Sequence, residues 1–297
     1  MAYQSPTTSP TTTALAAANA ADMSQEAQVI IDRAFASTPG RREIATIEHL
    51  QGGSYNSSHL ITLRDSSRFV LKISPPPDMR VLRCERDVCE AEADVLRMLR
   101  SAHPHLPVPD VVCYDDTRTL VDSPYILLTY VPGATLRSLR AQLPPEAADA
   151  VEREAASHVR ALAAVSPGTA GFGRATRAAR RFATWPEAFE ALLEAVLSDA
   201  ENMLVSLPYL ELRRQLRRCA PALKEVVVPA LAVLDLDDGS VLVDPCDGRV
   251  VALIDFERAG WYDPLLCAAL LEPSEAFAEG YGREALDAGS AKVRRIL

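Results

Sequence analysis

The stretch Val233–Pro264, VLDLDDGSVLVDPCDGRVVALIDFERAGWYDP, sets eight acidic residues between short runs of apolar, mostly β-branched side chains. Such runs predict strands, and Asp-Gly between two of them is a strong hairpin signal, so we expect a pair of hairpins. Acidic residues are common in turns for backbone reasons alone. Two interpretations are therefore open: the carboxylates only form turns, or they also hold a metal ion and handle a proton.

Length and composition indicate a globular protein of one large or two modest domains. The chain has 297 residues, of which 48% are hydrophobic and 24% are charged, which is ample for a packed core. Its formal net charge of -9 argues against nucleic-acid binding, because that binding relies on cations that neutralise phosphates. An acidic surface is compatible with a cationic small substrate, although solubility alone explains it equally well.

Cysteine usage and the first residues bear on the compartment. The six cysteines include no C-x-x-C pair and form no zinc pattern with the five histidines, so free thiols in a reducing compartment are the simpler interpretation. No apolar run approaches the roughly 18 residues of a membrane span, and we expect no membrane partner. The start of the chain lacks the basic and apolar regions of a signal peptide. We predict a cytoplasmic protein whose residues 1–23 form a disordered tail.

Hydrophobic spacing divides the remaining chain into two lobes. Residues 24–131 combine alternating, strand-like patterns with one amphipathic helix, CEAEADVLRMLRSA. Residues 132–297 carry several Ala-rich or amphipathic helical patterns around the acidic stretch. The sequence Val131-Pro132-Gly133 marks the break between them. We predict an α+β fold with a small β-rich N-terminal lobe and a larger, mainly helical C-terminal lobe.

Residue types that can carry chemistry follow one another in a definite order. The Gly52-Gly53-Ser54 break precedes a strand; it is a plain turn or a loop whose N–H groups approach phosphate oxygens. Lys72 lies in the strand pattern RFVLKI, where a surface lysine is the ordinary interpretation. Glu92 lies on the amphipathic helix, where a solvated carboxylate is usual. Asp235 and Asp255 each follow an apolar run of the acidic stretch.

The order of these parts is that of the protein-kinase template. LLTYVPGATL resembles the hinge of the aminoglycoside phosphotransferase family, and TWPEAFEALLEAVLSDA resembles its inserted helices. The segment from PALAVLDLDDG to WYDPLLCAAL resembles that family's catalytic segment, with IDFERAGWYDP as the most specific element. The resemblance covers roughly residues 45 to 285. It implies a two-lobed, protein-kinase-like fold and phosphoryl transfer from ATP or GTP, with Mg²⁺, to a hydroxyl of a small molecule.

The resemblance assigns roles to residues of the acidic stretch. Asp235 would accept or orient the proton of the acceptor hydroxyl, and Asp255 would bind Mg²⁺. Ser240 occupies the position of a second metal ligand. Asp263 would stabilise the fold around the catalytic loop. Carboxylates suit these roles because they are hard oxygen ligands for Mg²⁺ and can accept a proton.

The resemblance also assigns the nucleotide contacts. Lys72 would contact the α- and β-phosphates and pair with Glu92. The glycine-rich turn would cover the phosphates, and backbone groups of the hinge would hold the base. The residues of the turn and hinge are Gly52, Gly53, Ser54, Leu128, Thr129 and Tyr130.

The catalytic segment departs from the family pattern H-G-D-x-x-x-x-N, because Val233 stands for the histidine and Ser240 for the asparagine. A serine hydroxyl weakens the second metal site relative to an amide carbonyl. Whether Asp237 or Asp238 compensates through its charge stays open. The departures favour an alternative: a catalytically impaired pseudokinase that serves as a nucleotide- or ligand-binding module.

The identity of the acceptor is the property that the sequence indicates least. The acidic balance favours a cationic molecule, such as an aminoglycoside or another antibiotic, while resistance, biosynthesis and metabolism stay open as roles. We expect the acceptor to be lined by helices around Trp185–Asp199 and by the acidic run Glu272–Glu279. At least one of four carboxylates should contact it: Asp199, Glu201, Glu272 and Glu275. We expect a monomer or a weak homodimer.

Overall fold

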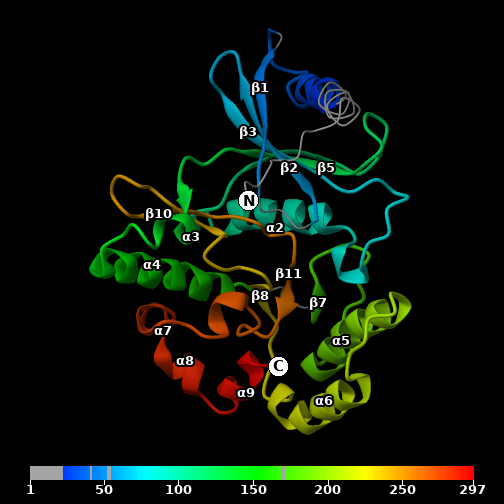
Figure 1. Cartoon of the computed structure of the whole chain (residues 1–297), viewed down its shortest axis with the longest axis vertical. Coiled ribbons are helices and arrows are strands. Elements are labelled where there is room, and N and C mark those ends of the chain that lie inside the picture. Colours follow the sequence, from blue (N-terminus) through cyan, green and yellow to red (C-terminus); the bar gives the residue numbers. More distant parts are fainter. Residues whose placement is uncertain (1–22, 41, 52–54, 167, 169–170) are drawn as a thin grey trace, which may run out of the picture. The chain divides into compact units, whose positions relative to one another are not determined.

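The computed structural model describes residues 23–40, 42–51, 55–166, 168 and 171–297. They form two compact units (Figure 1). The sheet unit comprises the described residues up to Pro77 together with Val112–Tyr130, and the helical unit comprises Asp78–Val111 and Val131–Leu297. The predicted α+β fold class is confirmed. The amphipathic helix α2 (Val88–Ala102), which the sequence pattern sets beside the N-terminal strands, belongs to the helical unit and packs there against β11.

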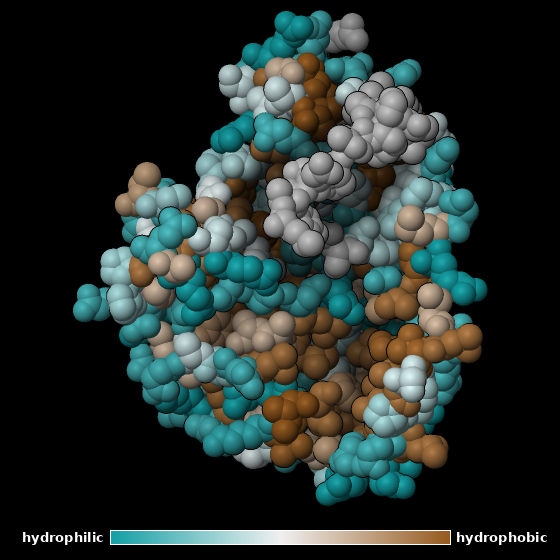
Figure 2. Space-filling model, viewed as in Figure 1, coloured by the Kyte–Doolittle hydropathy of each residue, from teal (hydrophilic) through white to brown (hydrophobic). Residues whose placement is uncertain are grey.

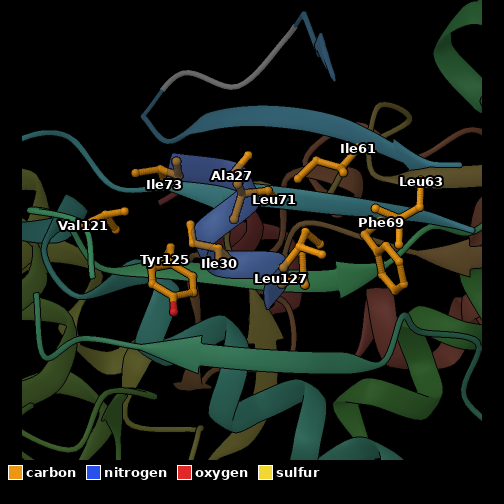
Figure 3. Packing of buried hydrophobic residues seen from close by; sticks show 11 residues of the cluster. Ala27, Ile30, Ile61, Leu63, Phe69, Leu71, Ile73, Val121, Tyr125 and Leu127 are labelled. Atoms are coloured by element: carbon orange, nitrogen blue, oxygen red, sulfur yellow. The ribbon is translucent and has the colours of Figure 1, made fainter. Parts of the chain in front are cut away.

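The sheet unit is built on five strands in the order β1-β2-β3-β5-β4. The pairs β1–β2, β2–β3 and β3–β5 are antiparallel. Residues 23–34 are helical, and their apolar side chains pack on the sheet: Ala27 and Ile30 join Ile61 and Leu71 in a core that excludes water (Figure 3). The strands are β1 (Ile44–His49), β2 (Ser57–Leu63), β3 (Arg68–Ile73), β4 (Val111–Asp115) and β5 (Tyr125–Thr129).

Two small sheets and most of the helices form the helical unit (Figure 1). One sheet has the order β10-β9-β6 and the other β7-β11-β8. The strands are β6 (Ala134–Thr135), β7 (Gly173–Arg174), β8 (Ala230–Val233), β9 (Val241–Val243), β10 (Val250–Leu253) and β11 (Ala259–Tyr262). Besides α2, the helices are α3 (Leu136–Leu139), α4 (Pro145–Ala163), α5 (Trp185–Asn202), α6 (Tyr209–Leu223), α7 (Glu275–Tyr281), α8 (Arg283–Asp287) and α9 (Ala291–Arg295), with 3-10 turns η1 (Arg83–Glu85) and η2 (Ala268–Leu270).

The starts of two long helices follow from their sequences. Helix α4 begins with Pro145, whose fixed φ suits the first helical position and whose missing N–H would be unpaired there in any case. Helix α5 begins after Thr184, which forms a capping box with Glu187: the Glu187 carboxylate accepts hydrogen bonds from the N–H and the hydroxyl of Thr184. These local signals agree with the helical patterns predicted within residues 132–297.

The acidic stretch contains one hairpin, so the prediction of two is wrong. Strands β9 and β10 pair antiparallel around Asp-Pro-Cys-Asp-Gly, as expected. Strand β8 pairs instead with β11, and its residues are all buried. Between β8 and β9 the Asp-Asp-Gly segment forms a local turn, in which Asp237 accepts the N–H of Gly239 (2.7 Å). The longer-range β8–β11 ladder therefore prevails over the local Asp-Gly signal.

Apolar side chains are also exposed on the helical unit. Figure 2 shows them gathered on the face that carries α5 and α6, and the connection between these helices contributes several of them. The connection contributes Met203, Leu204, Val205 and Leu207, and Leu210 lies in the first turn of α6. In the described part of the chain, no helix combines the length and apolar character that a membrane span requires.

Candidate active site

Two aspartates of the acidic stretch follow buried strands of the helical unit. Asp235 lies two residues beyond the end of β8, and Asp255 lies two residues beyond the end of β10. The loops are joined directly, because the N–H of Ile254 donates to the carbonyl of Ser240 (2.9 Å). The charge of Asp255 acts on the pKa of Asp235. The hairpin between β9 and β10 thus returns the chain from one carboxylate to the other.

Asp235 occupies an environment that favours its protonated form. Burial, reinforced by the charges of Asp255 and Glu257, raises its pKa from 3.8 to about 6, although the guanidinium of Arg258 acts in the opposite direction. Its Oδ1 is buried and has no hydrogen-bond partner among the described residues. A carboxylate with a pKa close to neutrality and an oxygen available for a substrate proton suits general-base chemistry.

Asp255 is held by its backbone in a conformation that L-residues seldom adopt. Its φ is 69°, in the left-handed region, which few residues other than glycine, asparagine and aspartate adopt. The following residue, Phe256, is fully buried and donates its N–H to Oε1 of Glu92 (3.1 Å). Glu92 is itself fully buried on α2. The carboxylate of α2 therefore fixes the peptide that directs Asp255.

Three carboxylates converge at this point and make the best candidate for a metal site. Glu92, Asp255 and Glu257 each place one oxygen so that all three lie within 4.8 Å of one another. Hard oxygen ligands of this kind fit Mg²⁺. Asp255 was predicted from the sequence as a metal ligand, whereas Glu257 was not. The signal was present in the run IDFER, where Glu257 follows Asp255 by two residues.

Ser240, the other predicted metal ligand, is buried next to the same loops. Its backbone N–H donates to the carbonyl of Asp237 (2.9 Å), and its carbonyl accepts the N–H of Ile254. The main chain of Ser240 thus joins the loop of Asp235 to the loop of Asp255. A role of its hydroxyl as a metal ligand stays a prediction.

The charges of Asp237 and Asp238 are already matched by arginines of the helical unit. Arg137 of α3 forms an ion pair with Asp237. Arg140, which follows α3, binds Asp238 (2.6 Å) and the buried Glu152 of α4 (2.6 Å). These pairs provide a structural use for both aspartates, and they do not support the idea that either one replaces the missing asparagine at position 240.

Arg258 is a further residue of the site that the sequence analysis missed. It is half-buried in the turn after Asp255, and its charge lowers the pKa of Asp235. Its backbone carbonyl accepts the N–H of Leu234 (3.4 Å), which ties it to the loop of Asp235. Arginine in the acidic run offered no local signal, because its proximity to Asp235 depends on the β8–β11 pairing.

The predicted nucleotide contacts belong to the sheet unit. Lys72 lies on β3 opposite Ile126 and is 8% exposed, so the interpretation as a surface lysine is wrong. Leu128 and Thr129 end β5, and the N–H of Tyr130 donates to the carbonyl of Arg68 (3.3 Å). The Gly52-Gly53-Ser54 turn lies outside the described residues. The pairing of Lys72 with Glu92, which belong to different units, stays a prediction.

Three of the four predicted acceptor carboxylates bind arginines. Asp199 accepts the N–H of Arg83 (2.7 Å) and pairs with its guanidinium (3.3 Å). Glu201 pairs with Arg213 (3.3 Å). Glu275 pairs with Arg283, and Glu272 is exposed after η2. An acceptor cation would compete with these arginines at three positions, whereas none of the ion pairs found among the described residues involves Glu272.

An open cavity of about 400 Å³ lies along the start of α5. Its lining combines arginines and glutamates, and one of the glutamates, Glu194, binds Arg213 through both oxygens. None of the four predicted acceptor carboxylates lines it. The full lining is Arg180, Arg181, Phe182, Ala183, Glu187, Glu190, Ala191 and Glu194.

Comparison with known proteins gives a consistent result. The profile of the phosphotransferase enzyme family matches residues 46–295. A search of curated proteins gave no match. Solved structures with the same fold include a ternary complex of streptomycin, ATP and APH(2")-IIa, which has 15% sequence identity and a TM-score of 0.56, with 85% of this chain and 81% of that chain covered.

Two other structural matches bear different names. One is a putative fructosamine-3-kinase from Thermobifida fusca, with 20% identity, a TM-score of 0.58, and 90% of this chain and 88% of that chain covered. The other is the macrolide 2'-phosphotransferase MphH from Brachybacterium faecium, with 19% identity, a TM-score of 0.54, and 90% and 87% of the two chains covered. At these identities the likeness establishes the fold.

Proposed function

The chain belongs to the phosphotransferase enzyme family, with its protein-kinase-like fold, and from this premise we propose that it transfers the γ-phosphoryl group of ATP or GTP, with Mg²⁺, to a hydroxyl of a small molecule. The general activity, that of a small-molecule phosphotransferase, follows from the family. The nucleotide, the metal and the acceptor are the parts that we propose.

The environment of Asp235 is the observation that carries the proposal. A hydroxyl acceptor must lose its proton as the new O–P bond forms, and a carboxylate within reach can take or orient that proton. Burial and the neighbouring carboxylates raise the pKa of Asp235 to about 6, and its Oδ1 has no partner in the described part of the chain. A purely structural aspartate would have its oxygens satisfied.

The residues around Asp255 fit a divalent cation. Asp255 and Glu257 would hold Mg²⁺, with Glu92 close by and Ser240 as a candidate further ligand. When bound, Mg²⁺ supplies charge that offsets the negative charge of the phosphate oxygens. In the protein itself, the left-handed conformation of Asp255 and the Glu92–Phe256 hydrogen bond orient the carboxylate for this role.

For the nucleotide, we propose the contacts implied by the sequence: the ammonium of Lys72 on the phosphates, and backbone groups of Leu128–Tyr130 on the base. The position of Lys72 on β3 supports this, because β3 pairs directly with β5, the strand that carries Leu128 and Thr129. A match whose structure contains ATP supports the use of ATP.

The acceptor is proposed as a cationic, hydroxylated molecule such as an aminoglycoside, with a role in antibiotic resistance. The negative net charge supports a cation, and the structural match bound to streptomycin supports the aminoglycoside class. The matches named for macrolide and fructosamine substrates define the competing acceptor classes. The pseudokinase alternative has no support from the comparisons, and the environment of Asp235 favours an enzyme.

The experiment is an acceptor screen with the purified full chain, Mg²⁺ and ATP or GTP. Streptomycin, gentamicin, a macrolide and a fructosamine each serve as acceptor, and mass spectrometry detects a product that has gained one phosphate. We expect transfer that depends on an acceptor and on Mg²⁺ and that disappears in Asp235→Asn. Tight nucleotide binding without transfer to any acceptor would refute the proposed activity with these classes and favour the binding module.

A further inference from the structure

The segment Asp263–Leu270 holds the loop that carries Asp235 through backbone hydrogen bonds. The N–H of Ala268 donates to the carbonyl of Leu234 (2.9 Å), and the N–H of Ala269 donates to the carbonyl of Leu236 (2.9 Å). These carbonyls belong to the residues on either side of Asp235. The orientation of the Asp235 peptide therefore depends on where this segment lies.

Helix α9 holds both ends of the same segment. At its start, Nη1 of Arg294 donates to both oxygens of Asp263 (2.8 Å each). At its end, Nη1 of Arg295 donates to the carbonyl of Leu270 (3.1 Å). Two consecutive arginines of one short helix thus reach the two ends of the segment that supports the loop.

The Arg294–Asp263 pair is buried and highly connected. The side chain of Asp263 is 3% exposed and that of Arg294 is 11% exposed. Oδ1 of Asp263 also accepts the N–H of Leu265 (3.0 Å), so the same carboxylate shapes the first turn of the segment. Burial raises the pKa of Asp263, while Arg294 and the Leu265 N–H act to lower it. Breaking one side of such a pair is strongly destabilising, because it leaves a buried charge without its partner.

The residues next to Asp235 in the chain, Leu234 and Leu236, contribute no polar side chain that could hold it. Val233, at the start of the loop, is buried and apolar. Oδ1 of Asp235 has no hydrogen-bond partner in the described part of the chain, so the side chain is not fixed through that oxygen. A misplacement of about 1 Å in a catalytic group can cost about a hundredfold in rate.

We propose that Arg294, assisted by Arg295, is a positioning residue for Asp235, acting through Asp263 and the N–H groups of Ala268 and Ala269. The catalytic consequence rests on the proposed phosphotransferase function. The mechanical part, that α9 fixes the loop of Asp235, does not depend on it.

The variants must separate positioning from folding. Arg294→Ala leaves Asp263 buried without its cation and risks unfolding. Arg294→Lys keeps the charge and loses the two-oxygen contact. The double variant Asp263→Asn with Arg294→Met removes the pair without a buried charge, and asparagine still accepts the Leu265 N–H. The matched control is Lys292→Met on the same helix, whose ion pair with Asp287 (3.2 Å) is exposed.

Two readouts are measured on the full chain. The first is amide hydrogen exchange, where we expect Ala268 and Ala269 to exchange about tenfold faster in the double variant, with a smaller effect in Arg294→Lys and no change in α4. The second is turnover of Mg·ATP with streptomycin, where kcat should fall about ten- to a hundredfold while the KM for ATP stays within about twofold. Lys292→Met should leave both readouts unchanged.

Unchanged exchange at Ala268 and Ala269 in a folded double variant would overturn the proposal. Equal acceleration at every amide of the helical unit would also overturn it, because α9 would then have only a general structural role. Faster local exchange with an unchanged kcat would refute positioning. If the unmodified chain turns over nucleotide with none of streptomycin, gentamicin, a macrolide and a fructosamine, the proposed function fails, and the exchange data still decide whether α9 fixes the loop.

Discussion

The loops of Asp235 and Asp255 lie side by side in the helical unit, yet each holds its aspartate side chain in a different way. At Asp235 the backbone is anchored on both sides, by the N–H groups of Ala268 and Ala269, while Oδ1 has no partner among the described residues. At Asp255 the backbone itself is unusual, with φ of 69°, and the carboxylate lies within 4.8 Å of two others.

This difference supports the two chemical roles that we propose for the two aspartates. Burial beside like charges raises the pKa of Asp235, which suits a group that accepts a proton near neutral pH. Convergence of Asp255 with Glu92 and Glu257 concentrates negative charge, which suits a cation. The local sequence presents both as aspartates after apolar runs; the family resemblance implies their different roles, and their surroundings support them.

The largest expected effect comes from Asp255→Asn. Asparagine tolerates the left-handed backbone, so the change removes mainly the charge. If Asp255 holds Mg²⁺, kcat should fall by about 10⁴. Turnover is measured at saturating ATP over a range of Mg²⁺ concentrations. The control is Asp247→Asn in the exposed hairpin turn, where asparagine can still accept the Arg249 N–H. A loss of less than about tenfold would contradict the metal assignment.

Asp235→Asn tests the other side of the comparison. Loss of the proton acceptor should lower kcat by about 10³, because general-base catalysis contributes roughly 10²–10⁴. Nucleotide binding should survive, since the change leaves Asp255, Glu257 and Lys72 in place. Turnover assays and calorimetry with Mg·ATP separate these effects. Unchanged turnover would show that another group handles the proton.

The same variant should be more stable than the parent at neutral pH. The pKa of Asp235 rises from 3.8 to about 6 on folding, so the folded state retains a proton that the unfolded state releases. This group's contribution to stability therefore falls as the pH rises through that window and stays low above it. Asp235→Asn should gain about 1–3 kcal/mol at pH 7 and nothing below about pH 4.

Urea unfolding at both pH values, with a chelator present, measures this gain. Asp247→Asn again serves as the control, because that aspartate is exposed in a turn. An Asp235→Asn variant that is less stable than the parent at pH 7 would mean that the carboxylate is stabilised by a partner in the folded state, contrary to the assigned burial effect.

The fold class could be predicted because hydrophobic spacing has local signatures, and the family resemblance implied that Asp235 and Asp255 belong to one site. Pro145 marks the start of helix α4 and Thr184 the start of helix α5. Asp235 and Asp255 each directly follow an apolar run. The burial of Lys72 could not be predicted from its strand pattern, because a lone lysine in such a pattern carries no information about burial.

The remaining features depend on contacts between distant segments. The pairing of β8 with β11 prevailed over the Asp-Asp-Gly hairpin signal. Arg137 and Arg140 meet Asp237 and Asp238 across about a hundred residues, so no spacing rule could have paired them. Arg294 reaches Asp263 only because α9 folds back onto the unit. Glu257 is the exception. It follows Asp255 by two residues, so its proximity to Asp255 could have been predicted from the sequence.

Glu257→Gln sharpens the comparison at smaller scale. If Glu257 shares the cation with Asp255, loss of its charge should raise the Mg²⁺ concentration for half-maximal turnover about tenfold and leave kcat at saturating Mg²⁺ within about threefold. The control is Glu284→Gln, an exposed glutamate at the start of α8. An unchanged Mg²⁺ requirement would remove Glu257 from the metal site.

The smallest effect is expected at the predicted acceptor carboxylates, and the structure ranks them. Glu201 pairs with Arg213, which is also held by Glu194, so an acceptor cation gains little there. Glu272 is exposed, so its charge can attract an acceptor cation, and dissolved salt screens that attraction.

Charge reversal in Glu272→Lys should therefore raise the KM for streptomycin about three- to tenfold at low salt, with the KM for ATP unchanged, whereas Glu201→Gln should change neither by more than about twofold. Both constants are measured at two ionic strengths, because a real charge effect must shrink as salt increases. If the KM for streptomycin is unchanged in Glu272→Lys at low salt, the acceptor is recognised elsewhere. The glutamate-lined cavity along α5 would then be the next surface to test, through Glu190→Lys.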